Sequence, residues 1–265
     1  MDVTPLVITY NEAPNIARTL ERLRWARRIV LVDSGSTDET LTIARRYPQV
    51  DILHRPFDTF ADQCNFGLTQ IESEWVLSLD ADYELSPALA AEIEALTPPA
   101  DVQGYRARFV YRIGGRPLRG TLYPPRVVLY RAKAGRYANE GHGHRLRISG
   151  RIEPLGGVIH HDDRKPLGRW LDSQRRYASA EAAHLLAAPA QELGVNDRIR
   201  LTGWLAPLLV LPYVLFAKGC LWDGRAGWFY ALQRLLAEVV IALELVDRRL
   251  AGAPKARTPT DEGAA

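Results

Sequence analysis

The sequence predicts an α/β fold, with a mostly parallel sheet flanked by helices and a helical, membrane-associated extension at the carboxyl end. Three observations predict it. Short apolar runs alternate with amphipathic stretches over residues 1–100, charge changes sign along the chain, and residues 201–217 carry no formal charge. At 47% apolar and 25% charged, the composition is that of an ordinary globular protein and argues against disorder.

Strand–helix alternation fills the first hundred residues. Buried strands are predicted at residues 5–9, 29–33, 50–54 and 75–80. Helical patterns lie between them at residues 14–26, 37–47, 59–71 and 87–96. Ser86 before Pro87 is typical of a helix start. This alternation predicts a parallel, doubly wound sheet.

The pattern changes after residue 100. Strands are expected at residues 104–113 and 126–131, joined by the Gly- and Pro-containing loop 114–125, before a polar, Gly-rich stretch at 135–143. From Leu167 the pattern is helical. We therefore expect four regions: the halves of an α/β domain at 1–100 and 101–165, a helical region at 166–252 and a disordered tail at 253–265.

The helical region contains the uncharged run at residues 201–217, which lies between Arg200 and Lys218 and includes Pro207 and Pro212. A spanning helix needs about 20 apolar residues, so a membrane-interfacial or re-entrant segment is favoured over a buried hairpin or a true span. A second apolar helix is expected at residues 226–246.

Two further features concern location. Cys64 and Cys220 are too far apart for a metal or redox motif and suit a reducing compartment. The first residues lack a signal-peptide pattern, so the amino end is expected in the cytoplasm.

Polar clusters follow three of the predicted strands, at residues 9–12, 33–36 and 80–82. In a doubly wound sheet the carboxyl ends of the strands form the ligand site. Asp80 and Asp82 are candidate ligands of a divalent cation such as Mg²⁺, which prefers carboxylate oxygens, although a solvated turn would have the same pattern. Asp33 is a candidate partner for a base or a ribose hydroxyl; the alternative is that Asp33 and Asp38 cap the following helix. The absence of Gly-rich phosphate-binding motifs disfavours dinucleotide and P-loop chemistry.

Four motifs resemble those of family 2 glycosyltransferases, which have the GT-A fold. They are Pro5-Leu-Val-Ile-Thr-Tyr-Asn-Glu12, Val32-Asp-Ser-Gly-Ser-Thr-Asp38, Gln63-Cys-Asn65 and Trp75-Val-Leu-Ser-Leu-Asp-Ala-Asp82. The segments 123–131, 138–142 and 222–227 and the region of His160 are similar to the bacterial lipopolysaccharide-core β-glucosyltransferase branch. The resemblance implies a nucleotide-sugar donor, Mg²⁺ or Mn²⁺, and inversion at the anomeric carbon.

The resemblance also assigns residues to the donor. Those expected to bind the nucleotide sugar are Thr9, Tyr10, Asn11, Glu12, Asp33, Gln63, Asn65, Asp80 and Ala81, and the metal ligands are Asp80 and Asp82. As helix-surface amides, Gln63 and Asn65 have an alternative interpretation without a role in binding.

An inverting transfer needs a base for the acceptor hydroxyl. Glu140, the one acid within residues 104–151, matches the Glu of a His-Glu pair in this branch, but Asn139 stands in the place of the His. His142 or His144 could compensate. His160 and His161 follow an apolar run. One of them could approach the diphosphate or the metal, and the alternative is an ordinary residue at the end of a strand. Tyr83 replaces a Glu that is common in the branch, and Glu84 could substitute for it.

The basic segment suggests the acceptor. Residues 104–151 hold 12 basic side chains and one acidic, against 8 and 16 in residues 1–100. This favours an anionic glycolipid or lipid-linked acceptor and a membrane surface, with Arg126, Arg131, His142 and His160 as candidate acceptor or phosphate contacts. A nucleic-acid partner is disfavoured.

The leading hypothesis is therefore a UDP-sugar-dependent hexosyltransferase at the cytoplasmic face of the inner membrane, most plausibly transferring glucose. The alternatives are transfer to polyprenyl phosphate, nucleotidyl transfer, or a catalytically idle binding protein.

Overall fold

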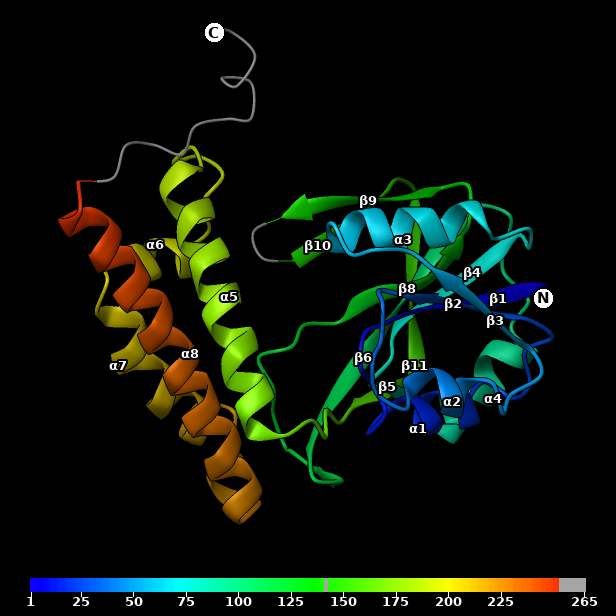
Figure 1. The fold of residues 1–265 in the computed structure, drawn as a ribbon, viewed down its shortest axis with the longest axis horizontal. Helices are drawn as coiled ribbons and strands as arrows, with labels where there is room; N and C mark the ends of the chain where they lie inside the picture. Colours follow the sequence, from blue (N-terminus) through cyan, green and yellow to red (C-terminus); the bar gives the residue numbers. More distant parts are fainter. Residues whose placement is uncertain (141–142, 253–265) are drawn as a thin grey trace, which may run out of the picture. The chain divides into compact units, whose positions relative to one another are not determined.

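A computed structural model describes residues 1–140 and 143–252, which form two compact units (Figure 1). The first unit contains residues 1–139 and 143–165. The second unit contains residues 166–252 and also includes Glu140. The first unit has a nine-stranded sheet whose order is β3-β2-β1-β4-β8-β6-β11-β5, with β7 paired to β6. A separate two-stranded sheet joins β9 to β10.

The strands that were predicted in the first hundred residues all form. They are β1 (Val3–Thr9), β2 (Ile29–Asp33), β3 (Val50–His54) and β4 (Trp75–Asp80). All four run parallel to their neighbours within this group. The register sets Thr9 opposite Asp33 and Ile8 opposite Asp80, so the carboxyl ends of β1, β2 and β4 meet at one edge.

Helices cover both faces of this part of the sheet (Figure 1). On one face lie α1 (Ile16–Glu21), α2 (Thr40–Ala44) and α4 (Pro87–Ala95), and α3 (Phe60–Thr69) lies on the other. Alternate strand residues divide accordingly, since Val7 packs in the cluster of α1 and α4, whereas Leu6 packs with Ala61 and Cys64 of α3. The first helix is shorter than predicted because i→i+3 turns, such as Ala26 N–H to Leu23 O, replace its last residues.

The rest of the sheet corrects the expectation of a mostly parallel sheet. Its strands are β5 (Tyr83–Leu85), β6 (Val102–Ile113), β7 (Arg116–Pro117), β8 (Arg126–Arg131) and β11 (Arg151–His161). The central strand β8 is antiparallel to both β4 and β6, and β5 is antiparallel to β11, so the sheet is mixed. The polar stretch at 135–143 contains β9 (Gly135–Glu140), which pairs with β10 (Gly143–Ile148).

The second unit is helical. It contains α5 (Leu167–Ala187), α6 (Val195–Leu201), α7 (Leu205–Pro212), the π-helix η1 (Tyr213–Ala217), the 3₁₀-helix η2 (Cys220–Asp223) and α8 (Gly224–Leu250). Its core joins Ala178, Ala182 and Leu185 of α5 to Ile241 and Leu245 of α8. Among the described residues, no single helix has both the length and the apolarity to cross a bilayer; Leu205–Ala217 and Cys220–Leu250 pass that test only together, and they are bent by 71°.

Candidate functional site

The loop after β1 is tied to the loop after β2 at the carboxyl edge of the sheet. Asn11 has a φ of 55°, a conformation that Asn tolerates, and its Oδ1 accepts the N–H of Thr37 at 2.7 Å. Glu12 N–H donates to Thr40 Oγ1 at 2.7 Å. Within this edge Thr9 Oγ1 is buried without a hydrogen-bond partner, whereas the side chain of Tyr10 is 50% exposed.

Asp33 is fully buried at the end of β2. Its carboxylate accepts the N–H groups of Gly35 and Ser36, each at 3.0 Å, and lies 3.3 Å from His54 Nδ1. Asp33 is therefore at the predicted edge, but its oxygens already stabilise the turn that follows it. Asp38 accepts the N–H of Thr40, the first residue of α2, at 3.0 Å, although the N-cap residue of that helix is Glu39.

Asp80 is the last residue of β4, and Ala81 and Asp82 follow it directly. Ala81 is buried, and its carbonyl accepts the hydroxyl of Thr19 at 2.8 Å, which fixes the backbone between the two carboxylates. One oxygen of Asp82, Oδ2, lies 3.3 Å from Nε2 of His161, while Oδ1 is buried and has no hydrogen-bond partner. Burial raises the pKa of Asp82, but the charge and hydrogen bond of His161 and the charge of Lys165 lower it, and the pKa is about 2.

These residues fit a hard divalent cation. Within residues 1–140 and 143–252 no group of three or more His, Cys, Asp or Glu side chains is arranged as a metal cage. Two neighbouring carboxylates, one with an ionised and unpartnered oxygen, suit an ion that completes its shell with water and substrate phosphate. Asp80 and Asp82 would hold the ion.

The residue that lies against Asp82 is His161, not its neighbour His160, which was the predicted acceptor or phosphate contact. Burial lowers the pKa of His161, but the charge and hydrogen bond of Asp82 raise it above its usual value. The ring of Tyr111 packs against the imidazole of His161 with centroids 4.6 Å apart. His160 instead pairs in register with Glu84, and its pKa is lowered by burial and by the charge of Arg112.

A buried ion pair joins Glu12 to Lys165, a residue that no sequence motif singles out. Lys165 Nζ lies 2.6 Å from Glu12 Oε1 and 3.5 Å from Asp163 Oδ1, and the side chains of Lys165 and Glu12 are 17% and 11% exposed. Burial and the charge of Asp82 raise the pKa of Glu12, whereas Lys165 lowers it. Lys165 thus places a positive charge among the carboxylates of this edge.

The segment after β11 is anchored to the helix that follows β1. Asp162, which is fully buried, accepts a hydrogen bond from Arg18 Nη1 at 3.1 Å and from Arg164 Nε at 2.9 Å. Asn15 Oδ1 accepts the N–H of Arg164 at 3.1 Å. These contacts hold His161 and Lys165 at the site although they lie about 150 positions from Glu12 in the sequence. No local pattern signals such a pairing, and within this segment the sequence points only to His160 and His161, which follow an apolar run.

The structure separates Arg126 from Arg131. Because β8 is antiparallel to β4, with Leu77 opposite Leu129, Arg126 lies toward the carboxyl end of β4 and Arg131 lies beside Trp75 at its amino end. The guanidinium of Arg126 is 4.3 Å from the centroid of the Tyr123 ring. Burial lowers its pKa, but Tyr123, Tyr83 and Asp80 raise it above the usual value. Arg131 pairs with Glu74 and donates to Val102 O, which are structural contacts.

Gln63 and Asn65 bind protein backbone. Gln63 Nε2 donates to the carbonyls of Arg55 and Pro56, while its Oε1 is buried without a partner. Asn65 makes two hydrogen bonds to the backbone of Tyr137, at 2.9 and 3.0 Å, which fasten α3 to β9. Neither residue therefore behaves as a simple surface amide.

The predicted base lies where little is described. Glu140 ends β9, and its side chain is not among the described groups; the same is true of His144. His142 falls outside the described residues, and Asn139 is exposed.

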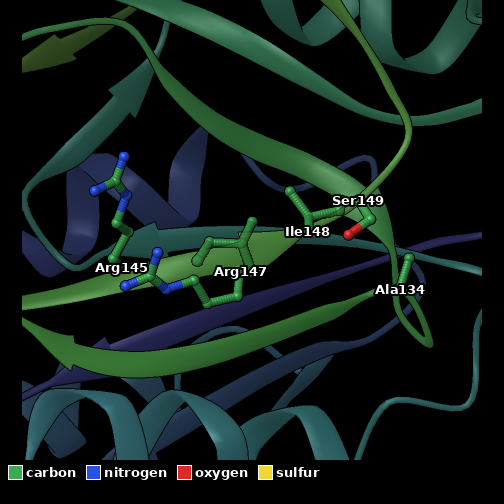
Figure 2. Close-up of a pocket in the computed structure, with 6 residues that line it drawn as sticks. Ala134, Arg145, Arg147, Ile148 and Ser149 are labelled. Carbon is green, nitrogen blue, oxygen red and sulfur yellow. The ribbon is translucent and has the colours of Figure 1, made fainter.

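A separate hollow of about 530 Å³ lies on the small sheet (Figure 2). It is lined by Ala134, Arg145, Leu146, Arg147, Ile148 and Ser149. None of the residues predicted to bind the donor lines it.

Comparison with known proteins identifies the family. The model of "Glycosyl transferase family 2" matches residues 6–143. An uncharacterized glycosyltransferase of Rickettsia prowazekii is 25% identical over 199 residues, which cover 69% of this chain and 68% of that protein. The lipopolysaccharide core biosynthesis glycosyltransferase LpsC of Rhizobium meliloti is 32% identical over 120 residues, but the match covers only 43% of this chain and 44% of LpsC.

A solved structure shares the fold. The mannosyltransferase PcManGT from Pyrobaculum calidifontis, determined in complex with GDP-Man and Mn²⁺, aligns over 96% of this chain and 88% of its own, with a TM-score of 0.55 and 17% identity. Its likeness supports the GT-A architecture of a mixed sheet with flanking helices. Since the family model covers 138 of the 265 residues, this chain belongs to glycosyltransferase family 2 and is a transferase enzyme.

Proposed function

We propose that this protein is a metal-dependent, inverting hexosyltransferase that transfers glucose from UDP-glucose to a lipid-linked or lipopolysaccharide-core acceptor at the cytoplasmic face of the inner membrane. The observation that carries the donor part is the carboxylate pair of Asp80 and Asp82, with the buried and unpartnered Oδ1 of Asp82. The GDP-Man and Mn²⁺ bound to the solved mannosyltransferase support a nucleotide-sugar donor and a divalent metal. The name of LpsC supports the acceptor class.

The donor would bind along the carboxyl edge of the parallel strands. Thr9, Tyr10, Asn11 and Glu12 come from the loop after β1, and Asp33 ends the neighbouring strand. A bound Mg²⁺ or Mn²⁺ would neutralise the charge of the diphosphate. Besides Lys165, Arg126 places a positive charge at this edge. It would stabilise the charge that develops on the leaving diphosphate.

Glu140 would serve as the base, removing the proton of the acceptor hydroxyl while that hydroxyl attacks the anomeric carbon from the side opposite the diphosphate. Transfer to polyprenyl phosphate, the alternative enzymatic hypothesis, uses the same donor site. It also accounts for the 12 basic side chains of residues 104–151, because a phosphate acceptor is anionic.

The donor proposal is tested by binding. Titration calorimetry with UDP-glucose, GDP-mannose and UDP-N-acetylglucosamine, each with Mn²⁺ and with EDTA, should show tightest binding of UDP-glucose, dependent on metal. Asp82→Asn should abolish the metal-dependent binding of the donor. The isosteric control Asp101→Asn, whose carboxylate is 64% exposed, should bind the donor as the wild type does. Metal-independent binding, or no binding of any nucleotide sugar, would contradict the proposal.

The base is tested by separating binding from transfer. Glu140→Gln should bind the donor as the wild type does and lose transfer to the acceptor, because an amide cannot accept the proton. Unchanged turnover in Glu140→Gln would refute this assignment. A panel of lipopolysaccharide-core and polyprenyl-phosphate acceptors, assayed with radiolabelled UDP-glucose, distinguishes the two acceptor hypotheses.

A further inference from the structure

Large apolar side chains are exposed on one part of the helical unit. They include Trp204, which directly precedes α7, Leu208 of α7 and Phe216 of η1. On η2 and α8 they include Trp222, Trp228 and Leu232; we call these six residues the apolar face. Their exposed fractions range from 43% for Trp228 to 74% for Trp222. Three of the six tryptophans of the chain belong to this group.

The exposed residues follow helical periodicity. Leu208, Pro212 and Phe216 are exposed and lie four positions apart, so they share one side of α7 and η1. The other side holds Val210 and Val214, which are buried. The segment formed by α7 and η1 therefore has a packed side within the unit and an apolar side that is largely exposed.

The charges of this region complement an anionic surface. Residues 201–237 contain three cations, Lys218, Arg225 and Arg234, and the single acid Asp223. The next acid, Glu238 of α8, is turned inward and bonded to Arg200 at 2.6 Å. Positive charge thus lies at the turn between the two arms of the apolar face, and Glu238, the nearest acid of α8 that follows it, is already paired.

The dimensions favour a partial insertion. Leu205–Ala217 contains 13 residues, which is about 20 Å of helix, whereas the hydrocarbon core of a bilayer is about 30 Å thick. The chain then bends by 71° into the next helices. Tryptophan, abundant here, favours the boundary between headgroups and acyl chains.

We propose that the apolar face inserts into one leaflet of a phospholipid bilayer that contains anionic lipid, without crossing it. This defines the surface by which the proposed lipid-directed transferase would reach its acceptor. This use of the surface rests on the proposed function, whereas the insertion of the apolar face into a bilayer does not depend on catalysis.

The test uses the full chain and vesicles of phosphatidylcholine with 30% phosphatidylglycerol. In flotation assays the wild type should bind, and its tryptophan fluorescence should be quenched by brominated lipid. Phe216→Ser/Trp222→Ser should weaken binding at least about tenfold, and Lys218→Gln/Arg225→Gln should weaken it about tenfold on these vesicles but little on pure phosphatidylcholine. The matched controls Phe57→Ser and Val195→Ser change side chains that are 52% and 75% exposed and lie outside the apolar face, so they should bind normally.

Absence of flotation by the wild type, or equal losses in the control variants, would overturn the proposal. So would a dimer in light scattering that Phe216→Ser/Trp222→Ser dissociates, because the face would then be covered by a second copy. The same variants should bind UDP-glucose as the wild type does. If the wild type itself fails to bind UDP-glucose, that result counts against the proposed function and not against the insertion.

Discussion

Replacing Lys165 by Met should destabilise the protein, because it leaves the carboxylate of Glu12 buried without its counter-charge. The ammonium lies 2.6 Å from Glu12 Oε1; among the described side chains, the one that would still donate a hydrogen bond to this carboxylate after its removal is Asn15, through Nδ2 at 2.8 Å. Removing one partner of a buried pair costs about 3–5 kcal/mol, and the 17% exposure of Lys165 favours the lower figure. About 3 kcal/mol corresponds to a fall in Tm of about 6–12 °C for a chain of this size.

The loss should depend on pH in a defined direction. The pKa of Glu12 is already raised by burial and by Asp82, and it rises further without Lys165. A carboxyl group whose pKa is raised in the folded protein contributes its full stability below its pKa in the unfolded chain, about 4.3 for Glu. That contribution is lost as the pH rises through the pKa in the folded protein. Lys165→Met should therefore cost less at pH 5 than at pH 8, as measured by urea unfolding at both pH values.

A surface pair provides the control. Arg151 and Asp101 are 2.8 Å apart but 54% and 64% exposed, so Arg151→Met should cost no more than about 1 kcal/mol. The double variant Glu12→Gln/Lys165→Met should be more stable than Lys165→Met alone, because it removes the unpaired charge. Equal costs for Lys165→Met and Arg151→Met, or simple additivity in the double variant, would refute this reasoning.

Three other predictions follow from neighbouring features. Arg126→Ala should lower the transfer rate at least about tenfold, because it removes a cation from the donor edge, whereas Arg131→Ala, at the far end of β4, should leave steady-state kinetics unchanged and lower only Tm. Gly157→Ala should destabilise the protein by more than about 2 kcal/mol in urea unfolding, because its Cβ would lie 2.6 Å from Leu89 Cα. The control Gly156→Ala should cost less than about 1 kcal/mol, because the nearest atom to its Cβ would be 3.7 Å away. Burial raises the pKa of Cys64 and so disfavours its reactive thiolate, and this thiol should therefore resist Ellman's reagent at pH 8 in the native protein and react in urea.

The sequence predicted the parallel half of the fold well, because each of its strands is a short apolar run and each carboxyl end carries polar residues. Local patterns also located Asp80 and Asp82 at the correct edge. They could not predict that β8 is antiparallel and central, since the direction of a strand depends on its partners rather than on its own residues. For the same reason the sequence predicts the same acceptor or phosphate role for Arg126 and Arg131, although they lie at opposite ends of β8.

Long-range partners account for the other differences. His161 and Lys165 are placed by contacts with Asp82 and Glu12, which are distant in sequence, and nothing local distinguishes His161 from His160. The membrane association of residues 201–217 and the role of Glu140 stay predictions.

The position of β11 has a consequence for synthesis. It is inserted between β6 and β5, so the last strand of the unit to be made belongs inside the sheet rather than at its end. A nascent chain that ends at residue 143, the limit of the family match, has every motif for the nucleotide sugar but leaves two strand edges open. Its native contacts close only after the ribosome has added residues 151–165, which makes the family segment alone a poor independent folding unit and a candidate for chaperone binding during translation.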